Sequence, residues 1–349
     1  MSDATIRIGR HVVGCGERVF VIAEAGVNHD GRIDDALRLI DAAAEAGADA
    51  VKFQIFSAEE LAARDAPTAA YQSGDGTTQR ELLQSLELPH DAFARLAARC
   101  AERGLVFLAT PFGLRDVEAL ARLGAAAIKI ASTDLDNVPL IRAATDAGVT
   151  LIVSTGAATR DELDAAVERL RAWKAAGRAI LLHCVSSYPT PLEAANLRRI
   201  AALRTRYETP VGFSDHTTAT RIGAWAVAAG ACVLEKHFTL DRARPGPDHA
   251  MSLEPDQLRE YISDVRAAEA ALGDGEIEMQ PIEQDVRRVA RKSVFAATRI
   301  AAGSRLTRAN LTTRRPGGGI SPDRFDELLS RVAAVDIPPD TPLAWNMIR

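Results

Sequence analysis

Two lysines lie within runs of otherwise apolar residues. Lys52 lies in AVKFQI (Ala50–Ile55), and Lys129 lies in AIKIAS (Ala127–Ser132). Because an unpaired ammonium group is costly to bury, each lysine needs a negatively charged partner. We favour a multiply charged anion held between the two lysines, such as a phosphate ester that also carries a carboxylate. The alternative is a purely structural Lys–Glu pair.

Two histidines end consecutive runs of the same kind. His216 ends PVGFSDH (Pro210–His216), and His237 lies near the end of CVLEKHFT (Cys232–Thr239). If these runs are neighbouring parallel strands, the two imidazoles can converge, and such a pair favours a divalent ion of borderline softness. Two protein ligands leave positions for water and substrate, as a catalytic metal requires. The alternative for each histidine is a hydrogen-bonded place in the core.

Other polar side chains follow further runs. Glu24, near the end of VFVIAEAG (Val19–Gly26), could exchange protons with a substrate or hold a sugar hydroxyl group, and its alternative role is to pair with Lys52. Hydroxyl groups that suit phosphate and carboxylate oxygens are carried by Thr110, Ser132, Ser154, Ser186 and Ser214.

The elements that must position these residues are strand-like runs that alternate with helical stretches over the first 275 residues. Besides those already given, the runs are Leu105–Pro111, Leu151–Gly156 and Ala179–Val185, which makes eight. Continuous apolar runs are typical of a parallel sheet covered on both faces. Amphipathic segments such as Ile33–Ala46 and Arg160–Lys174 lie between them, and several end in a glycine, which permits the left-handed stop of a helix.

Eight evenly spaced units predict an α/β fold of the (β/α)8 TIM-barrel type, with a doubly wound sheet as the alternative. In such a barrel, functional groups collect where the strands end, which is where the residues above are placed. Residues Ile6–Phe20 predict a hairpin that closes the floor of the barrel.

The sequence divides into three parts. Residues 1–274 form the predicted barrel, in which Asp256–Leu272 is the last helix, and residues 275–290 are a polar linker. Residues 291–349 predict a small, irregular β domain, because glycines and prolines interrupt their short apolar pieces. This last part has ten Lys or Arg against five Asp or Glu, although the whole chain has a net charge of −5. A basic C-terminal part could cover an anionic substrate as a lid or contact another subunit. The alternative is that its charge affects only solubility.

The composition excludes several classes of protein. With 349 residues, 47% of them hydrophobic, the chain has enough apolar material for a full core, and its apolar runs are too short to span a membrane. Its four cysteines, Cys15, Cys100, Cys184 and Cys232, are far apart, which argues against a disulfide scaffold and a zinc knuckle. Few aromatics and no long basic run argue against a nucleic-acid partner. Residues 1–16 lack a signal-peptide core, so we expect a cytoplasmic protein.

Nine segments together resemble the sialic acid synthases, in the right order and over nearly the whole chain. They are AEAGVNHDG (Ala23–Gly31), DAVKFQIF (Asp49–Phe56), FLATPF (Phe107–Phe112), IKIAS (Ile128–Ser132), STGAAT (Ser154–Thr159), LLHCVSSYPTP (Leu181–Pro191), VGFSDHT (Val211–Thr217), LEKHFTLDRARPGPDH (Leu234–His249) and RRPGGGISP (Arg314–Pro322). The resemblance implies a TIM barrel followed by an antifreeze-like (SAF) domain, which is a small β-clip fold. It also implies an enzyme that condenses phosphoenolpyruvate with an N-acetylated hexosamine to a nine-carbon ulosonic acid and releases phosphate by C–O cleavage.

The resemblance further implies a role for each matching residue. Lys52, Thr110, Lys129, Ser132, Ser154 and Ser214 match positions that bind phosphoenolpyruvate, and Ser186 stands where some members have asparagine. Glu24, Gln54, Tyr188 and Asp248 match positions that face the acceptor sugar. His216 and His237 match the ligands of a divalent metal, usually manganese, with magnesium and cobalt as alternatives, and Glu235 beside them could hold a water molecule.

Arg315 matches the arginine that the small domain of a partner subunit contributes to the sugar site, which implies a domain-swapped homodimer. Thr133-Asp134 depart from the GE or GD that follows this serine in many members, which leaves the acceptor open, and Ala157 replaces a common methionine. N-acetylmannosamine is our first expectation, because we see no extra cationic pocket for a phosphorylated sugar. A diacetamido-trideoxyhexose of the legionaminic or pseudaminic routes is the alternative. A metal-dependent barrel aldolase and a non-catalytic sugar-binding protein are the remaining alternatives.

Overall fold

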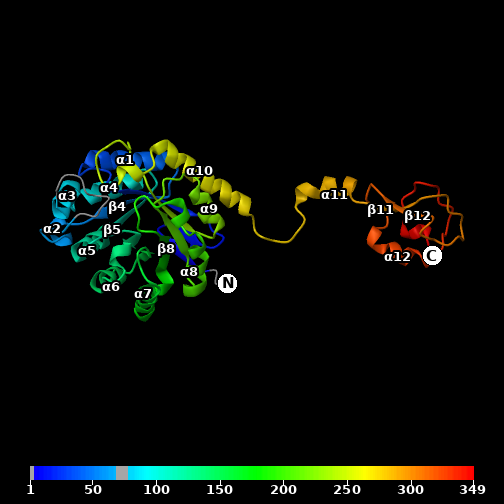
Figure 1. The fold of residues 1–349 in the computed structure, drawn as a ribbon, viewed down its shortest axis with the longest axis horizontal. Coiled ribbons are helices and arrows are strands. Elements are labelled where there is room, and N and C mark those ends of the chain that lie inside the picture. The colour runs from blue at the N-terminus through cyan, green and yellow to red at the C-terminus, as the bar shows by residue number, and fades with distance from the viewer. Residues whose placement is uncertain (1–3, 68–77) are drawn as a thin grey trace. The chain divides into compact units, whose positions relative to one another are not determined.

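A computed structural model describes residues 4–67 and 78–349 of the chain. The chain divides into two compact units, Met1–Asp274 and Gly275–Arg349, and each is described here by itself (Figure 1). Among the described residues, none of the helices combines the length and apolar character that crossing a bilayer requires.

The first unit is built on a closed barrel of parallel strands. The order around the barrel is β10-β3-β4-β5-β6-β7-β8-β9, so each strand pairs with its neighbour in sequence and β10 closes onto β3. The bounds are β3 Phe20–Gly26, β4 Ala50–Ile55, β5 Val106–Pro111, β6 Ala127–Ile130, β7 Thr150–Ser154, β8 Ala179–Cys184, β9 Val211–Asp215 and β10 Val233–His237. The eight predicted runs are all strands, and the predicted TIM barrel is confirmed.

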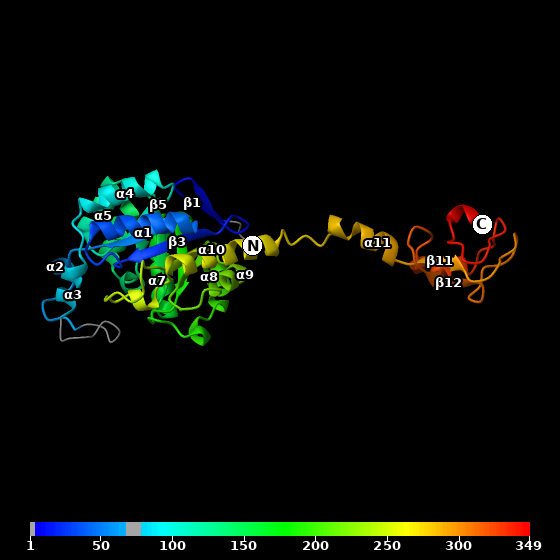
Figure 2. The same cartoon turned by 90° about the horizontal axis from the view of Figure 1, so that it is seen from above.

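Helices surround this barrel (Figures 1 and 2). Their bounds are α1 Ile33–Ala46, α2 Ala58–Leu61, α3 Gln79–Leu86, α4 Ala92–Glu102, α5 Leu114–Arg122, α6 Val138–Asp146, α7 Arg160–Ala172, α8 Arg198–Tyr207, α9 Ile222–Ala228 and α10 Pro255–Leu272. Gly47, which ends α1, has a φ of 87°, and Gly124, Gly148 and Gly230 also have positive φ. These four glycines therefore take the left-handed conformation that the sequence predicted.

The barrel has an inner and an outer core, and the strands alternate between them. The hairpin of β1 (Thr5–Ile8) and β2 (His11–Gly14) packs its apolar side chains against inward residues such as Ile152 and Val233. This contact confirms the predicted plug of the barrel floor. Leu234 and Phe213 instead belong to the outer core beneath the helices. Since side chains alternate along a strand, the sites two and four residues beyond Val233 also face inward.

The second unit is a small β domain with its own core. Strands β11 (Ser293–Ala296) and β12 (Leu311–Arg314) pair in antiparallel fashion, and isolated bridges such as Ile300 with Ile337 add further pairing. A helix, α12 (Phe325–Leu328), and buried side chains such as Leu306 and Leu343 complete it.

The segment predicted to be a linker contains a helix that the sequence analysis did not predict. After the turn Pro281–Glu283, α11 runs over Gln284–Ala290. Pro281 stands at the start of that turn, where its fixed φ favours a helical conformation. The Glu283 side chain accepts a hydrogen bond from the Gln280 backbone N–H at 2.9 Å, which caps the turn.

Candidate functional site

A buried group of charged side chains lies at the carboxyl ends of β3, β4 and β10. Lys52 Nζ lies 2.7 Å from Glu24 Oε2 and 3.6 Å from Glu235 Oε2. Glu24 pairs with both neighbours in the barrel, since it stands opposite Lys52 on β4 and His237 on β10. All four side chains are buried. The register of three adjacent strands therefore brings one ammonium group between two carboxylates.

Lys129 and two hydroxyl groups complete this charged group. Lys129 Nζ lies 3.8 Å from Glu235 Oε1, so Glu235 stands between the two lysines. The Ser214 hydroxyl donates a hydrogen bond of 2.7 Å to the same Glu235 oxygen, and Lys52 donates one of 3.0 Å to Thr110 Oγ1. The Lys–Glu pairing that the sequence left as the alternative therefore exists. Whether an anion also binds between the lysines stays a prediction.

Burial and charge set the protonation of this group. Burial raises the pKa of Glu24 to about 7, against the opposing effect of Lys52. Burial also acts to raise the pKa of Glu235, but Lys129 and Lys52 outweigh it, so this pKa falls below its usual range. Burial lowers the pKa of Lys129. Glu235 is therefore an anion at neutral pH, while Glu24 can hold or release a proton there.

His216 and His237 face each other across the neighbouring ends of β9 and β10. Their ring centroids are 5.7 Å apart, and the Tyr188 ring lies 4.3 Å from that of His216. His216 Nδ1 bonds to the Val185 carbonyl at 2.8 Å, which leaves Nε2 to face the site. Burial lowers the pKa of both histidines, so both imidazoles are neutral and able to ligate.

This pair fits a metal as two of its ligands. His237 Nδ1 is buried and makes no hydrogen bond with a described residue, although Asp248 Oδ2 lies 3.7 Å away. Among residues 4–67 and 78–349, however, no three His, Cys, Asp or Glu side chains are arranged around one metal position. Water or substrate would have to supply the remaining ligands.

Three predicted acceptor residues, Glu24, Gln54 and Asp248, converge on Gly26. A Cβ at position 26 would lie 3.3 Å from Glu24 Oε1, 3.4 Å from Asp248 Oδ2 and 3.7 Å from Gln54 Nε2. Gly26 has a φ of 53°, which an L side chain rarely adopts, so both its backbone conformation and this close approach favour glycine. Burial raises the pKa of Asp248 to about 6. Arg315 is exposed and belongs to the second unit.

A cluster of small polar side chains surrounds Gly156, at the ends of β6, β7 and β8. The Ser186 hydroxyl donates to Ser132 Oγ at 3.4 Å, and Ser132 Oγ lies 3.6 Å from Cys184 Sγ. Ser154 is buried at the end of β7, two residues beyond the inward-facing Ile152. Cys184 was not predicted to belong to the site, although its place at the end of an apolar strand was the available signal.

Asn28 is a second residue that was not predicted from the sequence to belong to the site. Its side chain donates to the Phe238 carbonyl at 2.8 Å and to Ser252 Oγ at 3.0 Å, and the Ser252 hydroxyl donates to the Asp248 carbonyl at 2.6 Å. Asn28 thus fixes the loop that carries Asp248. A polar residue directly after the first barrel strand was the signal in the sequence.

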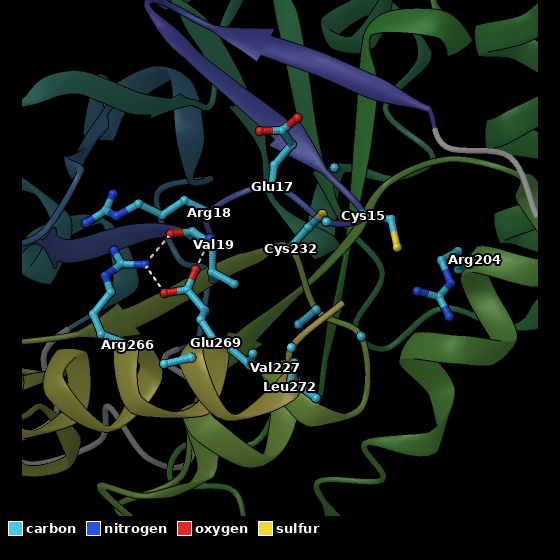
Figure 3. Close-up of a pocket in the computed structure, with 16 residues that line it drawn as sticks. Cys15, Glu17, Arg18, Val19, Arg204, Val227, Cys232, Arg266, Glu269 and Leu272 are labelled. Atoms are coloured by element: carbon cyan, nitrogen blue, oxygen red, sulfur yellow. Dashed lines mark hydrogen bonds and ion pairs between the residues drawn. The ribbon is translucent and has the colours of Figure 1, made fainter. Parts of the chain in front are cut away.

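A pocket of about 580 Å³ lies at the other end of the barrel (Figure 3). Val19 and Cys232, which directly precede β3 and β10, line it. Arg266 and Glu269 of α10 form an ion pair of 2.8 Å at its wall, beside Val19. Its lining, as described, includes none of the predicted site residues. The floor pocket is therefore separate from the charged group at the carboxyl ends.

Comparison with known proteins identifies the family. The model of the NeuB family matches residues 39–277, which is more than half of the chain. The chain belongs to the NeuB family. The second unit of this NeuB-family protein matches the SAF domain over residues 291–349, as predicted.

Several relatives of this NeuB-family protein are named synthases. It is 39% identical to the N,N′-diacetyllegionaminic acid synthase of Campylobacter jejuni, over 91% of this chain and 96% of that one. It is 36% identical to the N-acetylneuraminate-9-phosphate synthase of Mus musculus, over 86% and 84% of the two chains. The crystal structure of the N-acetylneuraminic acid synthetase of Leptospira borgpetersenii has 38% identity and a TM-score of 0.73, over 81% of this chain and 94% of that one. The predicted sialic acid synthase family and the predicted enzymatic character are confirmed.

Proposed function

We propose that this chain condenses phosphoenolpyruvate with an N-acetylated amino sugar to form a nine-carbon ulosonic acid and inorganic phosphate. The observation that carries the proposal is the convergence of two lysines, two glutamates and two histidines at the carboxyl ends of neighbouring strands. Phosphoenolpyruvate carries several negative charges, and the synthase relatives support its use.

Lys52 and Lys129 bind the phosphate and carboxylate of phosphoenolpyruvate and take up the charge that phosphate carries away. Both ammonium groups are buried, so each contact to an anion is stronger than it would be in water. Ser132, Ser186 and Ser154 donate hydrogen bonds to the phosphate oxygens from the side of β6 to β8. When the anion binds, it takes the place of a glutamate beside each lysine, so each lysine keeps a negatively charged partner.

The two glutamates divide the proton transfers of the reaction. C3 of phosphoenolpyruvate forms a bond to the aldehyde carbon of the open-chain sugar, and the aldehyde oxygen then takes a proton from Glu24. Water adds to C2 and gives one proton to Glu235, the glutamate that is ionised at rest. The C2–O bond then breaks, the C2 hydroxyl gives its proton to the departing phosphate, and the 2-keto acid remains. The proton on Glu235 passes through water to Glu24, so that both glutamates return to their starting states.

His216 and His237 hold a divalent metal, for which manganese is our first candidate. When bound there, such an ion supplies Lewis-acid polarisation of the aldehyde oxygen. The chain contributes two neutral imidazoles, held by the Val185 carbonyl on one side and approached by Asp248 on the other.

Two acceptors are candidates. N-acetylmannosamine follows from the sequence, in which we see no extra cationic pocket for a phosphorylated sugar. A diacetamido-trideoxyhexose is the second, and the identity of 39% with a diacetyllegionaminic acid synthase favours it.

An assay of phosphate release tests both the proposed reaction and the choice of acceptor sugar. The purified chain is incubated with phosphoenolpyruvate, Mn2+ and each sugar in turn, and phosphate and the ulosonic acid are quantified. We expect phosphate only when an acceptor is present, in equal amount to the ulosonic acid. Absence of phosphate with every sugar would overturn the proposal and would favour an aldolase that uses other substrates.

Gly156→Ala is expected to raise the KM for phosphoenolpyruvate about ten- to hundredfold, because misplaced binding groups cost that much. The new Cβ would lie 2.3 Å from Ser186 Oγ and 2.7 Å from Cys184 Sγ, so both side chains must move. Initial rates at varied phosphoenolpyruvate measure the effect. Gly177→Ala is the matched control, since a Cβ there meets no atom within 4 Å. An equal rise in the KM of the sugar would contradict a phosphate-binding role.

The rate is expected to fall as the pH rises through the pKa of Glu24, which burial raises to about 7. The rate falls in this direction because the protonated carboxyl is the proton donor, and the carboxyl loses its proton above this pKa. Glu24→Gln should lower kcat and remove this alkaline limb from the pH profile of kcat/KM. A limb that persists unchanged in Glu24→Gln would assign it to another group.

Arg315→Ala is expected to raise the KM of the sugar and to leave the affinity for phosphoenolpyruvate unchanged, if a partner subunit's Arg315 reaches the acceptor. Mixing Arg315→Ala chains with Lys52→Ala chains should then restore activity, because a mixed dimer contains one intact site. Activity is measured after joint unfolding and refolding of the two variants, with each variant alone as control. No restoration would exclude a contribution in trans.

A further inference from the structure

A buried ion pair lies on the outer face of the two strands that carry the histidines. Lys236 Nζ lies 2.8 Å from Asp215 Oδ2, and both side chains are completely shielded from solvent. Asp215 and Lys236 are register partners on β9 and β10. They alternate with Ser214, His216, Glu235 and His237, so they point away from the site toward the helices.

The same pair also holds the backbone around His216. The other Asp215 oxygen accepts a hydrogen bond of 2.8 Å from the Thr217 N–H. The Lys236 ammonium group donates to the Thr217 carbonyl. Both polar groups of the Thr217 backbone are thus fixed, and His216 lies between the two anchored residues.

Large apolar and aromatic side chains lie beside this pair. The Tyr261 ring of α10 lies 5.9 Å from Lys236 Nζ, and Leu234 and Phe213 flank the pair along the two strands. Burial lowers the pKa of Lys236, while the Asp215 carboxylate acts in the opposite direction. Buried charges of this kind are stable only when paired, so the position of each side chain fixes that of the other.

We infer that Asp215 and Lys236 are positioning residues that hold His216 and His237 at the separation needed to bind one metal ion. The inference rests on the proposed function, because it takes the two histidines as the metal ligands. Groups that orient metal ligands without touching the metal typically change metal affinity about ten- to hundredfold when replaced.

Mn2+ binding to the full chain tests the inference without any substrate. Free Mn2+ is measured by electron paramagnetic resonance as the protein is titrated, for the unaltered chain and for Lys236→Met, in which a side chain of similar length stays beneath Tyr261. We expect Lys236→Met to bind Mn2+ about ten- to hundredfold more weakly. The unaltered chain should bind one Mn2+, and His237→Ala should abolish that binding.

Two further variants separate positioning from loss of stability. Asp215→Asn combined with Lys236→Met removes both charges and so leaves neither one buried alone, but it also removes the ammonium group from the Thr217 carbonyl. Leu234→Ala is the matched control, because it weakens packing on the same face of β10 and touches neither charge. If the double variant and Leu234→Ala unfold at similar thermal midpoints, we expect weak Mn2+ binding in the double variant and unchanged Mn2+ binding in Leu234→Ala.

The outcomes are distinguishable. Unchanged Mn2+ affinity in a folded double variant would overturn the positioning role and leave the metal site of the proposed function intact. An unaltered chain that binds no Mn2+ at the two histidines would overturn that metal site, and the positioning role with it. Equal weakening in Leu234→Ala and the double variant would assign the effect to general stability and overturn the inference.

Discussion

Replacing Lys52 with methionine is expected to lower kcat/KM for phosphoenolpyruvate by about a hundred- to thousandfold, which is typical for the loss of a preorganised group that stabilises developing charge. Lys52 lies between Glu24 and Glu235 and donates to Thr110. Its removal takes one of two cations from the phosphate and leaves two buried carboxylates facing each other. Initial rates of phosphate release at varied phosphoenolpyruvate measure the loss.

Stability must be separated from catalysis in this experiment. Breaking a buried ion pair by removing one partner typically costs about 3–5 kcal/mol. We therefore expect Lys52→Met to lower the free energy of unfolding by that order, as measured by urea denaturation. Adding Glu24→Gln to Lys52→Met removes one unpaired carboxylate and should recover part of the stability, but not the activity.

The matched control is Lys174→Met, the same substitution at an exposed lysine after α7. It should change neither stability nor rate beyond experimental error. If the double variant regains activity together with stability, neither Lys52 nor Glu24 is needed for the chemistry, and both the anion-binding and the proton-donor parts of the proposed function are wrong.

The barrel could be predicted from the sequence because its strands are short apolar runs with a regular spacing. Seven of the eight runs contain the whole observed strand, β7 begins one residue before its predicted run, and the predicted Ile33–Ala46 has the bounds of α1. The second unit is less regular, and α11 was missed because it spans only Gln284–Ala290 and follows a polar stretch that contains a proline. The hydrogen bond between Gln280 and Glu283 caps the turn before α11 and not α11 itself.

The site could be predicted as a set of residues, but not as a set of contacts. Period-two alternation places Lys52, Lys129 and Glu235 inside the barrel, and they do converge. The sequence could not show that Glu235 stands between both lysines, because that depends on the register of non-consecutive strands.

His237→Ala is expected to lower metal-dependent turnover by at least about a thousandfold, since a metal ion contributes several kcal/mol of transition-state stabilisation. The imidazole lies opposite that of His216, and its Nδ1 makes no hydrogen bond with a described residue, so its removal should not expose a buried partner. The fold should therefore persist, which circular dichroism and thermal denaturation can check.

The decisive measurement compares the affinity of His237→Ala for phosphoenolpyruvate with its affinity for Mn2+. Because Lys52 and Lys129 hold phosphoenolpyruvate in the proposed function, calorimetry should show its affinity within about threefold of the unaltered chain, which corresponds to less than 1 kcal/mol, while Mn2+ binding is lost. His90→Ala is the control, since His90 bonds to Asp116 at 2.7 Å and is no part of the site. Full turnover by metal-stripped His237→Ala would contradict the metal's role. Loss of both ligands together would instead show that His237 supports the whole site. Removal of this one imidazole would then disturb the lysines as well as the metal position.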